Sequence, residues 1–520
     1  MPRSSHWLVL VLIAAAPAAA QAPEPSAELP PGAPPAMAEI DRTGLLEHAA
    51  YLASDELGGR YTSSEGQRKA AEYIAKHFES LGLAPLGDKP KDGSRSYYQA
   101  WPLNRESLNP EGTSISFGAV QAHAGFGLIR GKGKTRWPLE GPLSFCGDGS
   151  KDLLPRGKFK TKIPVIVLTE PDGGPRRRTR SSLTFQRASA ISRELKKRGA
   201  RAALYLLLSE DSPVANTFNG ASGLTPNKPM LAYGKIKNRG MLAHSVPGVF
   251  LGRPLALKLM EHMGLRVDGQ VVSGEPDEAA TINIAVQVEM DKKAKAVNVV
   301  AVLEGADKTQ SKEAVIYSAH MDHMGMRLDG DAFNGADDNA SGTAGLLEIA
   351  AAFAKGERPI RSVIFLAVSG EEEGLWGSKW FAENPTWPMK RVVANVNIDM
   401  IGRSTRLAGP GQIAATPSFE HAYYNTMVRT AYELGAQIGL KLTKGDRYYT
   451  RSDHYNFARA DVPVVFFCDG EHEDYHKVTD HVDLLDGGKM ERVARLAYWT
   501  GWEVAQDKKK PKRLGRQNEW

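Results

Sequence analysis

The stretch VIYSAHMDH (residues 315–323) decides the fold class of this 520-residue chain. Its first part, Val315 to Ala319, is an apolar run of the length of a β-strand that is buried on both faces. Strands of this kind belong to parallel sheets that helices cover on both sides. His320 and Asp322 follow directly, so the end of the predicted strand carries two side chains of the kind that bind metals.

Two further predicted strands end in the same way. Ser362 to Val368 precedes a run of three glutamates, and Val392 to Ile398 precedes Asp399. A helical pattern from Ala340 to Ala354 separates the first two strands. Because alternating strands and helices form a sheet whose loops meet at the carboxyl ends of the strands, we expect these side chains at one rim of one α/β sheet.

Metal-type residues are concentrated in five short segments of the chain. The segments are AHMDH (319–323), GADDNASG (335–342), SGEEEGLWGS (369–378), NIDMIG (397–402) and DYHKVTD (474–480). Together they offer ligands for two divalent metals and a spare carboxylate that can move a proton. This combination indicates metal-assisted hydrolysis.

Several of these segments also have structural explanations. In GADDNASG, Asp338 and Asn339 are natural helix-start residues, and the three glutamates suit a solvated turn. Asp399, however, ends an apolar run, where a carboxylate without a partner is costly. In AHMDH, Asp322 is placed to accept the second N–H of the His320 imidazole, as a metal-bound histidine commonly requires.

In this order the segments resemble the dizinc aminopeptidases, which share a fold with glutamate carboxypeptidase and with transferrin receptor. The resemblance runs from about Val297 to Asp480, with weaker similarity over 52–83, where ASDELGGR (53–60) is typical of bacterial members. PGVFLGRPLALKL (247–259) resembles part of a protease-associated domain. The resemblance implies a mixed, largely parallel central sheet flanked by helices, the zinc exopeptidase fold, with an inserted β-rich protease-associated domain.

The resemblance also implies a role for each site residue and two Zn²⁺ ions per chain. His320, Asp338 and Asp399 would bind one zinc, and Asp338, Glu372 and His476 the other. Glu371 would be the general base, Asp322 the partner of His320, and Tyr475 a group that stabilises the tetrahedral intermediate. Glu373 receives no role.

The composition divides the chain into six parts. We expect a signal peptide at 1–20, a Pro/Ala-rich linker at 21–38, a first part of the peptidase domain at 39–124, the inserted domain at 125–275, the catalytic domain at 276–505 and a basic tail at 506–520. The first twenty residues carry Arg3, the apolar run Trp7 to Ala16 and three alanines before Gln21, the pattern of a cleaved export signal. We therefore expect a secreted or periplasmic protein without a membrane span after signal cleavage.

The remaining composition is ordinary for a globular protein. Only Cys146 and Cys468 occur, so neither a disulfide framework nor a thiolate metal site is expected. The net charge is +6, with basic runs at 176–180 and 508–516 that lack interleaved aromatic residues, so we expect solvated surface and no nucleic-acid partner. The sequence leaves the oligomeric state unknown.

Three classes of function fit these observations. An exported aminopeptidase that hydrolyses N-terminal residues of peptides through a metal-bridging hydroxide is favoured. A metallo-carboxypeptidase or dipeptidase, or an enzyme like glutaminyl cyclase, would use the same scaffold. A non-catalytic binding protein is the third class, and it should bind no metal.

Overall fold

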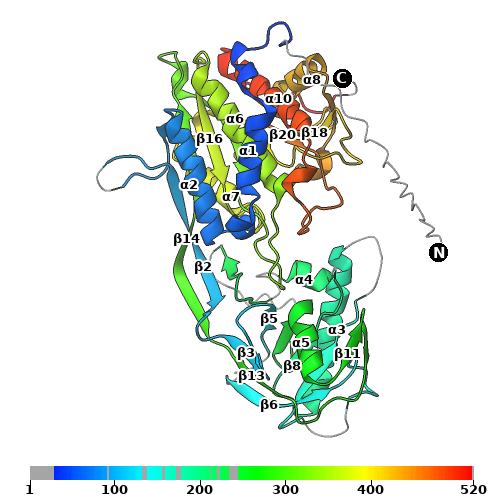
Figure 1. The fold of residues 1–520 in the computed structure, drawn as a ribbon. Helices are drawn as coiled ribbons and strands as arrows, with labels where there is room; N and C mark the ends of the chain where they lie inside the picture. Colours follow the sequence, from blue (N-terminus) through cyan, green and yellow to red (C-terminus); the bar gives the residue numbers. More distant parts are fainter. Residues whose placement is uncertain are drawn as a thin grey trace, which may run out of the picture.

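The computed structural model contains two lobes that are joined by long strands (Figure 1). It describes residues 29–90, 93–131, 137–154, 159–170, 177–210, 212–218, 223–233 and 244–517. The predicted signal peptide and residues 21–28 of the predicted linker lie outside these residues. None of the helices in the described ranges has both the length and the apolar composition that a bilayer crossing requires.

The larger lobe is built on a ten-stranded mixed sheet. Its order is β19-β18-β20-β17-β15-β16-β14-β2-β9, and β1 pairs with β14. The four central strands β20, β17, β15 and β16 are parallel, whereas β14, β2 and β9 continue the sheet in antiparallel fashion. The strands are β1 (Ala84–Pro85), β2 (Tyr98–Leu108), β9 (Met230–Ala232), β14 (Val288–Leu303), β15 (Ala314–His320), β16 (Ser362–Val368), β17 (Val392–Ile398), β18 (Gln412–Thr416), β19 (Lys441–Lys444) and β20 (Val464–Cys468).

Helices cover both faces of this sheet. One face packs against α1 (Arg42–Leu52), α2 (Glu65–Ser80), α6 (Gly342–Lys355), α8 (Thr426–Gln437) and α10 (Gly487–Gln506). The other packs against α7 (Trp376–Glu383) and α9 (His454–Arg459). Along β15, Val315 and Tyr317 point into the first core and Ile316 into the second, as the alternation of side chains along a strand requires. The fully buried strand that was predicted here is confirmed.

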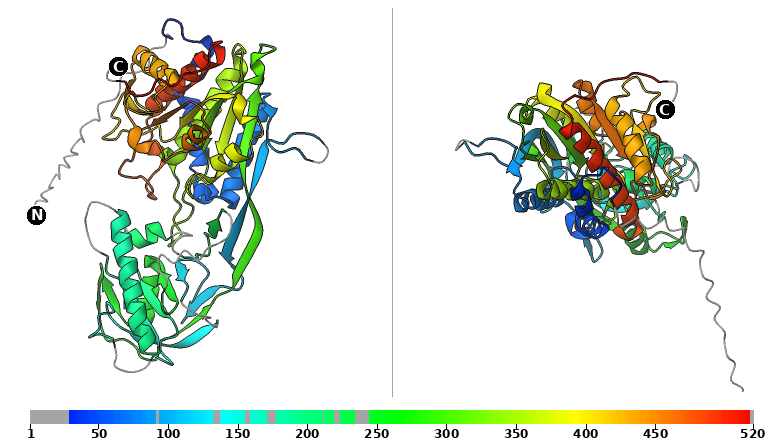
Figure 2. Two further views of the ribbon diagram at one scale, coloured as in Figure 1. Left: turned by 180° about the vertical axis from the view of Figure 1, so that it is seen from behind. Right: turned by 90° about the horizontal axis from the view of Figure 1, so that it is seen from above.

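The smaller lobe contains an eight-stranded sheet of its own, in the order β4-β3-β13-β6-β7-β8-β10-β5. Figure 2 shows from behind how β2 and β14 run from one lobe to the other. The strands are β3 (Ser114–Phe117), β4 (Val120–Ala122), β5 (Phe126–Ile129), β6 (Leu139–Phe145), β7 (Ile163–Val167), β8 (Ala203–Leu206), β10 (Gly248–Leu251) and β13 (Thr281–Ala285), accompanied by α3 (Arg177–Lys197), α4 (Pro213–Thr217) and α5 (Arg253–His262). Strands β3, β4 and β13 lie outside the range 125–275 expected from composition.

The boundaries of two helical segments differ from what the sequence pattern predicts. The apolar spacing predicts a helical segment from about Ile40 to Leu83, whereas the structure has two helices, α1 and α2, separated by the short turn Asp55–Arg60. The pattern also predicts a basic helix from Ser181 to Arg198, whereas α3 begins at Arg177, so part of the basic run 176–180 is helical.

The basic C-terminal segment lies along the larger lobe, and its basic side chains from Lys508 to Arg516 are exposed, as expected of a solvated surface. Arg513 Nη2 is 2.9 Å from Asp461 Oδ1, and Lys510 Nζ is 2.7 Å from Glu313 Oε1. The backbone N–H of Leu514 donates to the carbonyl of Tyr424 over 2.7 Å. Backbone hydrogen bonds therefore hold this segment against the lobe, and the exposed ion pairs add little.

Candidate metal centre

The candidate metal centre lies at the carboxyl ends of the central parallel strands. His320 is the last residue of β15, the three glutamates 371–373 follow β16, and Asp399 directly follows β17. Because these three strands are adjacent and parallel, their ends meet at one rim. Asp338 reaches the same rim from the turn Ala336–Ser341 before α6, and His476 from the loop after β20.

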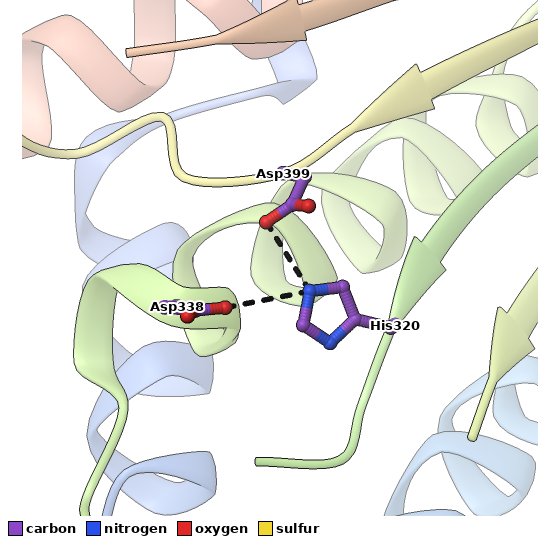
Figure 3. A group of neighbouring side chains, drawn as sticks. All are labelled: His320, Asp338 and Asp399. Carbon is purple, nitrogen blue, oxygen red and sulfur yellow. Dashed lines mark ion pairs between the residues drawn. The ribbon is translucent and has the colours of Figure 1, made fainter. Parts of the chain in front are cut away.

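His320, Asp338 and Asp399 converge on one point, as Figure 3 shows. Nε2 of His320 is 3.4 Å from Oδ1 of Asp338 and 3.2 Å from Oδ1 of Asp399. All three residues are buried. One nitrogen and two carboxylate oxygens facing one another form a donor set that suits zinc, and the ligand atoms lie within 4.8 Å of one another.

A second group shares Asp338 with the first. Nε2 of His476 is 3.0 Å from Oδ2 of Asp338 and 3.2 Å from Oε2 of Glu372. The two oxygens of Asp338 therefore face different groups of ligands: Oδ1 faces His320, and Oδ2 faces His476. This is the geometry that a carboxylate bridging two cations requires.

His323 belongs to the second group, although the sequence analysis gave it no role. Its Nδ1 is 2.8 Å from Oε1 of Glu372 but 3.8 Å from Oδ2 of Asp338. His476, in contrast, lies at nearly equal distances from both carboxylates. His323 thus contacts the Glu372 oxygen that His476 does not. Its position directly after Asp322, in the segment AHMDH, was the available signal.

The electrostatics of the second group follow from these contacts. Burial favours a higher pKa for Glu372, but His476 and His323 hold the pKa of this carboxyl well below its usual value. For His476, the charges of Glu372 and Asp338 outweigh burial and raise the pKa to about 10. The charges and hydrogen bonds of the two histidines thus stabilise the ionised form of the Glu372 carboxyl, a function that metal ions can also perform.

Glu371 stands beside both groups without belonging to either. Burial raises its pKa well above the ordinary value, and the charges of Asp399 and Glu372 act in the same direction against that of His320. Its backbone N–H donates to Oδ1 of Asp322 over 3.3 Å. A carboxyl with a raised pKa next to a metal centre is suited to accept a proton and later release it.

The carboxylate of Asp322, expected as the partner of His320, lies farther from that ring than the backbone carbonyl of the same residue. Nδ1 of His320 lies 3.1 Å from the backbone carbonyl of Asp322 and 3.8 Å from its carboxylate. The carboxylate instead accepts hydrogen bonds from the Thr62 hydroxyl, at 2.7 Å, and from the Glu371 backbone. The strand turns directly after His320, so the carbonyl of Asp322 is the nearer acceptor and its side chain is free to hold the glutamate turn.

Buried polar residues hold the loops that carry the ligands. Arg60, from the ASDELGGR stretch, is almost fully buried and donates to the carbonyls of Met321, Asn334 and Gly335. Asp480 accepts hydrogen bonds from the backbone N–H groups of Asp337 and Asp338 at 3.1 to 3.2 Å. Segments that are far apart in the sequence are therefore joined directly around Asp338.

A pocket opens beside the centre, with acidic residues on one part of its lining and an apolar wall on another. Its lining includes Asp338, Glu371 and Asp399 together with Met400, Tyr448, Phe466, Cys468, Tyr475, Arg451 and Glu471. Tyr475 stacks on the ring of His476, with ring centroids 3.8 Å apart, and burial raises the pKa of its phenol well above the ordinary value. The phenol is thus protonated and able to donate a hydrogen bond into the pocket.

The segment from Tyr448 to His454 contributes to this pocket only in part. Tyr448 and Arg451 line it, whereas Ser452 accepts a hydrogen bond from Asn397 beneath the strand ends. Asp453 and His454 are fully buried behind the centre. Met400, Phe466 and Cys468 form the apolar wall of this pocket. The sequence analysis gave them no role in a pocket, because the sequence does not distinguish an apolar residue that lines a pocket from one in the core.

The sequence of this chain is similar to those of known metallopeptidases. Residues 298–500 match the model of Peptidase family M28. A "Probable zinc metalloprotease" of Pyricularia oryzae is 31% identical over 252 residues, which cover 40% of this chain and 49% of that protein. "Aminopeptidase YwaD" of Bacillus subtilis is 30% identical over 190 residues, which cover 35% of this chain and 40% of that protein. The chain thus spans about half the length, or less, of these relatives.

The structural comparison extends over both lobes. The structure of BSAP, a zinc aminopeptidase from Bacillus subtilis, superposes with a TM-score of 0.56 and covers 91% of this chain and 97% of that one. The two sequences are 18% identical in this superposition, so the likeness is one of fold. The α/β fold class predicted from the sequence is confirmed.

Proposed function

We propose that this chain, whose residues 298–500 form a peptidase family M28 domain, is an exported aminopeptidase that uses two zinc ions. The observation that carries the proposal is the position of Asp338, whose two carboxylate oxygens face two separate groups of ligands. Glu371 stands beside both groups. The names of relatives such as "Aminopeptidase YwaD" support the same activity.

We assign the ligands as the sequence resemblance implied. His320, Asp338 and Asp399 would hold one zinc, and Asp338, Glu372 and His476 the other. When bound, zinc at these positions would lower the pKa of a coordinated water to about 7 and polarise the carbonyl of the substrate. Glu371 would take the proton from the attacking water and return it to the leaving amine. Tyr475 would donate a hydrogen bond to the substrate oxygen.

The charges around the pocket favour an aminopeptidase over a carboxypeptidase. Arg451 is the one cationic side chain among the described residues that line the pocket, and its Nη1 is 2.7 Å from Oε1 of Glu471. A carboxypeptidase needs an available cation for the terminal carboxylate of its substrate. The acidic lining suits the α-ammonium group of a peptide instead, and the apolar wall suits an uncharged N-terminal side chain.

The test compares substrates that differ only in their N-terminus. Leucine p-nitroanilide and its N-acetylated form would be offered to the purified chain with and without a chelator, alongside zinc analysis. We expect hydrolysis of the free form alone, loss of activity with the chelator, recovery with zinc, and two zinc ions per chain. Equal hydrolysis of both forms, or cleavage only at a free C-terminus, would refute the aminopeptidase assignment.

The same anilide and zinc assays also distinguish the other candidate functions. An enzyme like glutaminyl cyclase would bind one zinc and cyclise N-terminal glutamine without hydrolysing the anilide. A binding protein would bind no metal and hydrolyse neither substrate.

We also propose that the protein is exported after its signal peptide is cleaved. The apolar run Trp7 to Ala16 and the alanines that follow it support cleavage near Ala20. N-terminal sequencing of the protein recovered outside the cytoplasm would test this, and an intact Met1 would contradict it. We further propose that the smaller lobe is a protease-associated domain, on the strength of its β-rich sheet and the PGVFLGRPLALKL segment.

A further inference from the structure

A fully buried ion pair lies behind the candidate metal centre. Nζ of Lys489, in the first turn of α10, is 2.5 Å from Oδ1 of Asp469, which directly follows β20. The exposed fraction of each side chain is 0%. Taking two charges out of water costs free energy that their attraction often fails to offset, so a pair of this kind is weak evidence for a role in stability alone. The contacts of the pair indicate a second role.

The ammonium group of Lys489 also binds one loop through its backbone. Nζ donates hydrogen bonds to the carbonyls of Arg403 at 2.7 Å, Ala408 at 3.2 Å and Gly409 at 3.4 Å. These carbonyls belong to residues 400–409, the loop that directly follows Asp399. The loop contains neither helix nor strand, so its backbone groups need partners from elsewhere. Lys489 supplies a donor that three of its carbonyls share.

Asp469 holds the same loop from the opposite charge of the pair. Its Oδ2 accepts a hydrogen bond from the backbone N–H of Arg403 at 2.9 Å. Its own backbone N–H donates to the carbonyl of Met400 at 2.7 Å. The ion pair therefore binds both backbone groups of Arg403: Asp469 accepts from the N–H, and Lys489 donates to the carbonyl.

The three backbone N–H groups that precede Arg403 are bound by the turn Ala336–Ser341, which carries Asp338. These hydrogen bonds join Met400 N–H to Asn339 Oδ1 at 3.1 Å, Ile401 N–H to Ser341 Oγ at 3.1 Å and Gly402 N–H to Asp337 Oδ1 at 2.7 Å. Four successive N–H groups of the loop thus donate to side chains, and Asp469 provides the last acceptor. The loop after Asp399 is fixed against the turn of the proposed bridging ligand.

The side chain of Arg403 extends the connection to the loop of His476. Nη2 of Arg403 is 2.8 Å from Oδ2 of Asp474, two positions before His476. Asp474 also accepts a hydrogen bond from the hydroxyl of Thr479 at 2.7 Å, across the same loop. Arg403 therefore connects the loop that begins at Asp399 with the loop that carries His476, and the buried ion pair sets where its backbone lies.

We propose that Lys489 and Asp469 are positioning residues, whose buried ion pair fixes the backbone of Arg403 and with it the loops that carry Asp399 and His476. The effect on catalysis rests on the proposed function, whereas the effect on the loop of residues 400–409 does not. Without the lysine, three carbonyls of this loop lose their common donor. The metal ligands are then less well ordered before zinc binds, and the affinity for zinc falls.

Hydrogen–deuterium exchange of the metal-free chain measures the effect on the loop without any need for activity. In Lys489→Met we expect faster exchange over residues 400–409 and unchanged exchange over β15 and β16, which the ion pair does not contact. Wild-type exchange over residues 400–409, or equal acceleration over β15, β16 and the loop, would overturn the proposal.

The decisive variant combines Lys489→Met with Asp469→Asn. Lys489→Met alone leaves a buried carboxylate without its cation and should destabilise the fold, whereas the double variant removes both charges and should recover stability. The asparagine keeps an oxygen that can accept from the Arg403 N–H, but the carbonyls of the loop still lack the lysine. We expect fast exchange over residues 400–409, and zinc affinity and kcat each about 10-fold below wild type, the scale of residues that orient metal ligands.

The double variant therefore separates positioning from stability. Denaturant unfolding would measure stability, and calorimetric zinc titration and kcat on leucine p-nitroanilide would measure function. Recovery of zinc affinity and kcat together with stability would show that the ion pair serves stability alone and would overturn the proposal. Should Lys489→Met not fold, the double variant compared with wild type still decides the question.

The matched control is Arg361→Met. Arg361 is also a buried cation, with 1% of its surface exposed, and it donates to the carbonyls of Val504 at 2.8 Å and Lys508 at 3.1 Å. It precedes β16, at the end of this strand that lies opposite the glutamate turn. The variant should lose stability but keep zinc affinity and kcat within twofold of wild type. Losses equal to those of Lys489→Met would show that removal of any buried cation has this effect and would overturn the proposal.

The proposed function and the role of the ion pair fail in different ways. If wild type binds no zinc and hydrolyses no anilide, the proposed function fails, whereas exchange of the metal-free chain still decides the role of Lys489. If wild type is an active zinc enzyme but exchange over residues 400–409 is the same in wild type and both variants, only the role of the ion pair is refuted.

Discussion

The backbone N–H of Glu371 donates a hydrogen bond to Oδ1 of Asp322 over 3.3 Å. The other carboxylate oxygen of Asp322 accepts from the Thr62 hydroxyl at 2.7 Å. One buried carboxylate therefore fixes the proposed general base relative to the strand end that carries His320. A glutamate in a flexible turn would sample many positions, and this hydrogen bond restricts them.

Asp322→Ala should lower kcat about 10- to 100-fold while both zinc ions stay bound, because the variant loses the anchor of the Glu371 turn but no ligand. Steady-state kinetics with zinc analysis would check this. Thr62→Val removes only one of the two hydrogen bonds of Asp322 and should therefore lower kcat less than Asp322→Ala does. A wild-type kcat in Asp322→Ala would contradict the positioning role.

Glu371→Ala should retain two zinc ions and lose about 10² to 10⁴ in rate, the usual scale of general acid–base catalysis. The measurement is kcat on leucine p-nitroanilide with metal content determined on the same sample. Near wild-type turnover with both metals bound would exclude Glu371 as the base.

His476→Ala and His323→Ala should have different effects on metal content. His476 faces two carboxylates at 3.0 and 3.2 Å, as a ligand would, so its loss should leave about one zinc per chain. His323 lies 2.8 Å from Glu372 but 3.8 Å from Asp338, so its loss should weaken one site about 10- to 100-fold without abolishing it. Zinc titration by calorimetry would distinguish them, and the reverse pattern would make His323 the ligand.

His454 should make the protein sensitive to acid. Its ring is fully buried and stacks on Phe466, with centroids 4.4 Å apart, and burial lowers its pKa to about 3 from an ordinary value of about 6.5. Between these pH values the unfolded chain binds one proton more than the folded chain. The free energy of unfolding is therefore unaffected by His454 above pH 6.5. Below that value it falls by about 1.4 kcal/mol per pH unit as the pH decreases.

Denaturant unfolding of wild type and His454→Leu at pH 7.5 and pH 5 would check this effect. The free energy of unfolding should fall between the two values by about 2 kcal/mol less in the variant than in wild type. Identical changes in both proteins would show that His454 already titrates normally when folded.

The sequence predicted the parts of the fold that depend on local patterns. The apolar runs ending at Ala319, Val368 and Ile398 predicted three adjacent strands, because burial on both faces leaves a continuous apolar run in the sequence. Helix α6 was predicted in the same way from its periodicity. The break between α1 and α2 was missed, although the pair Gly58-Gly59 in the turn between them is a helix-breaking signal.

The sequence predicted only some of the residues of the candidate site. Residue types that rarely occur at strand ends without a reason, such as His320 and Asp399, stood out in the sequence. Residues whose role depends on a distant partner did not stand out. His323 acquires its contact from Glu372, and Thr62 acquires its hydrogen bond from Asp322, 260 positions later in the chain.

The sequence by itself determined the α/β class, the strand ends that carry metal-type side chains and the resemblance that assigns their roles. Only the tertiary structure decided which oxygen of Asp338 faces which histidine, and that Asp322 accepts a hydrogen bond from the glutamate turn. The physical reason is that hydrophobic periodicity is a local property of the chain. Hydrogen bonds and charge contacts between distant segments, in contrast, depend on distances and directions that are set only when the lobes pack.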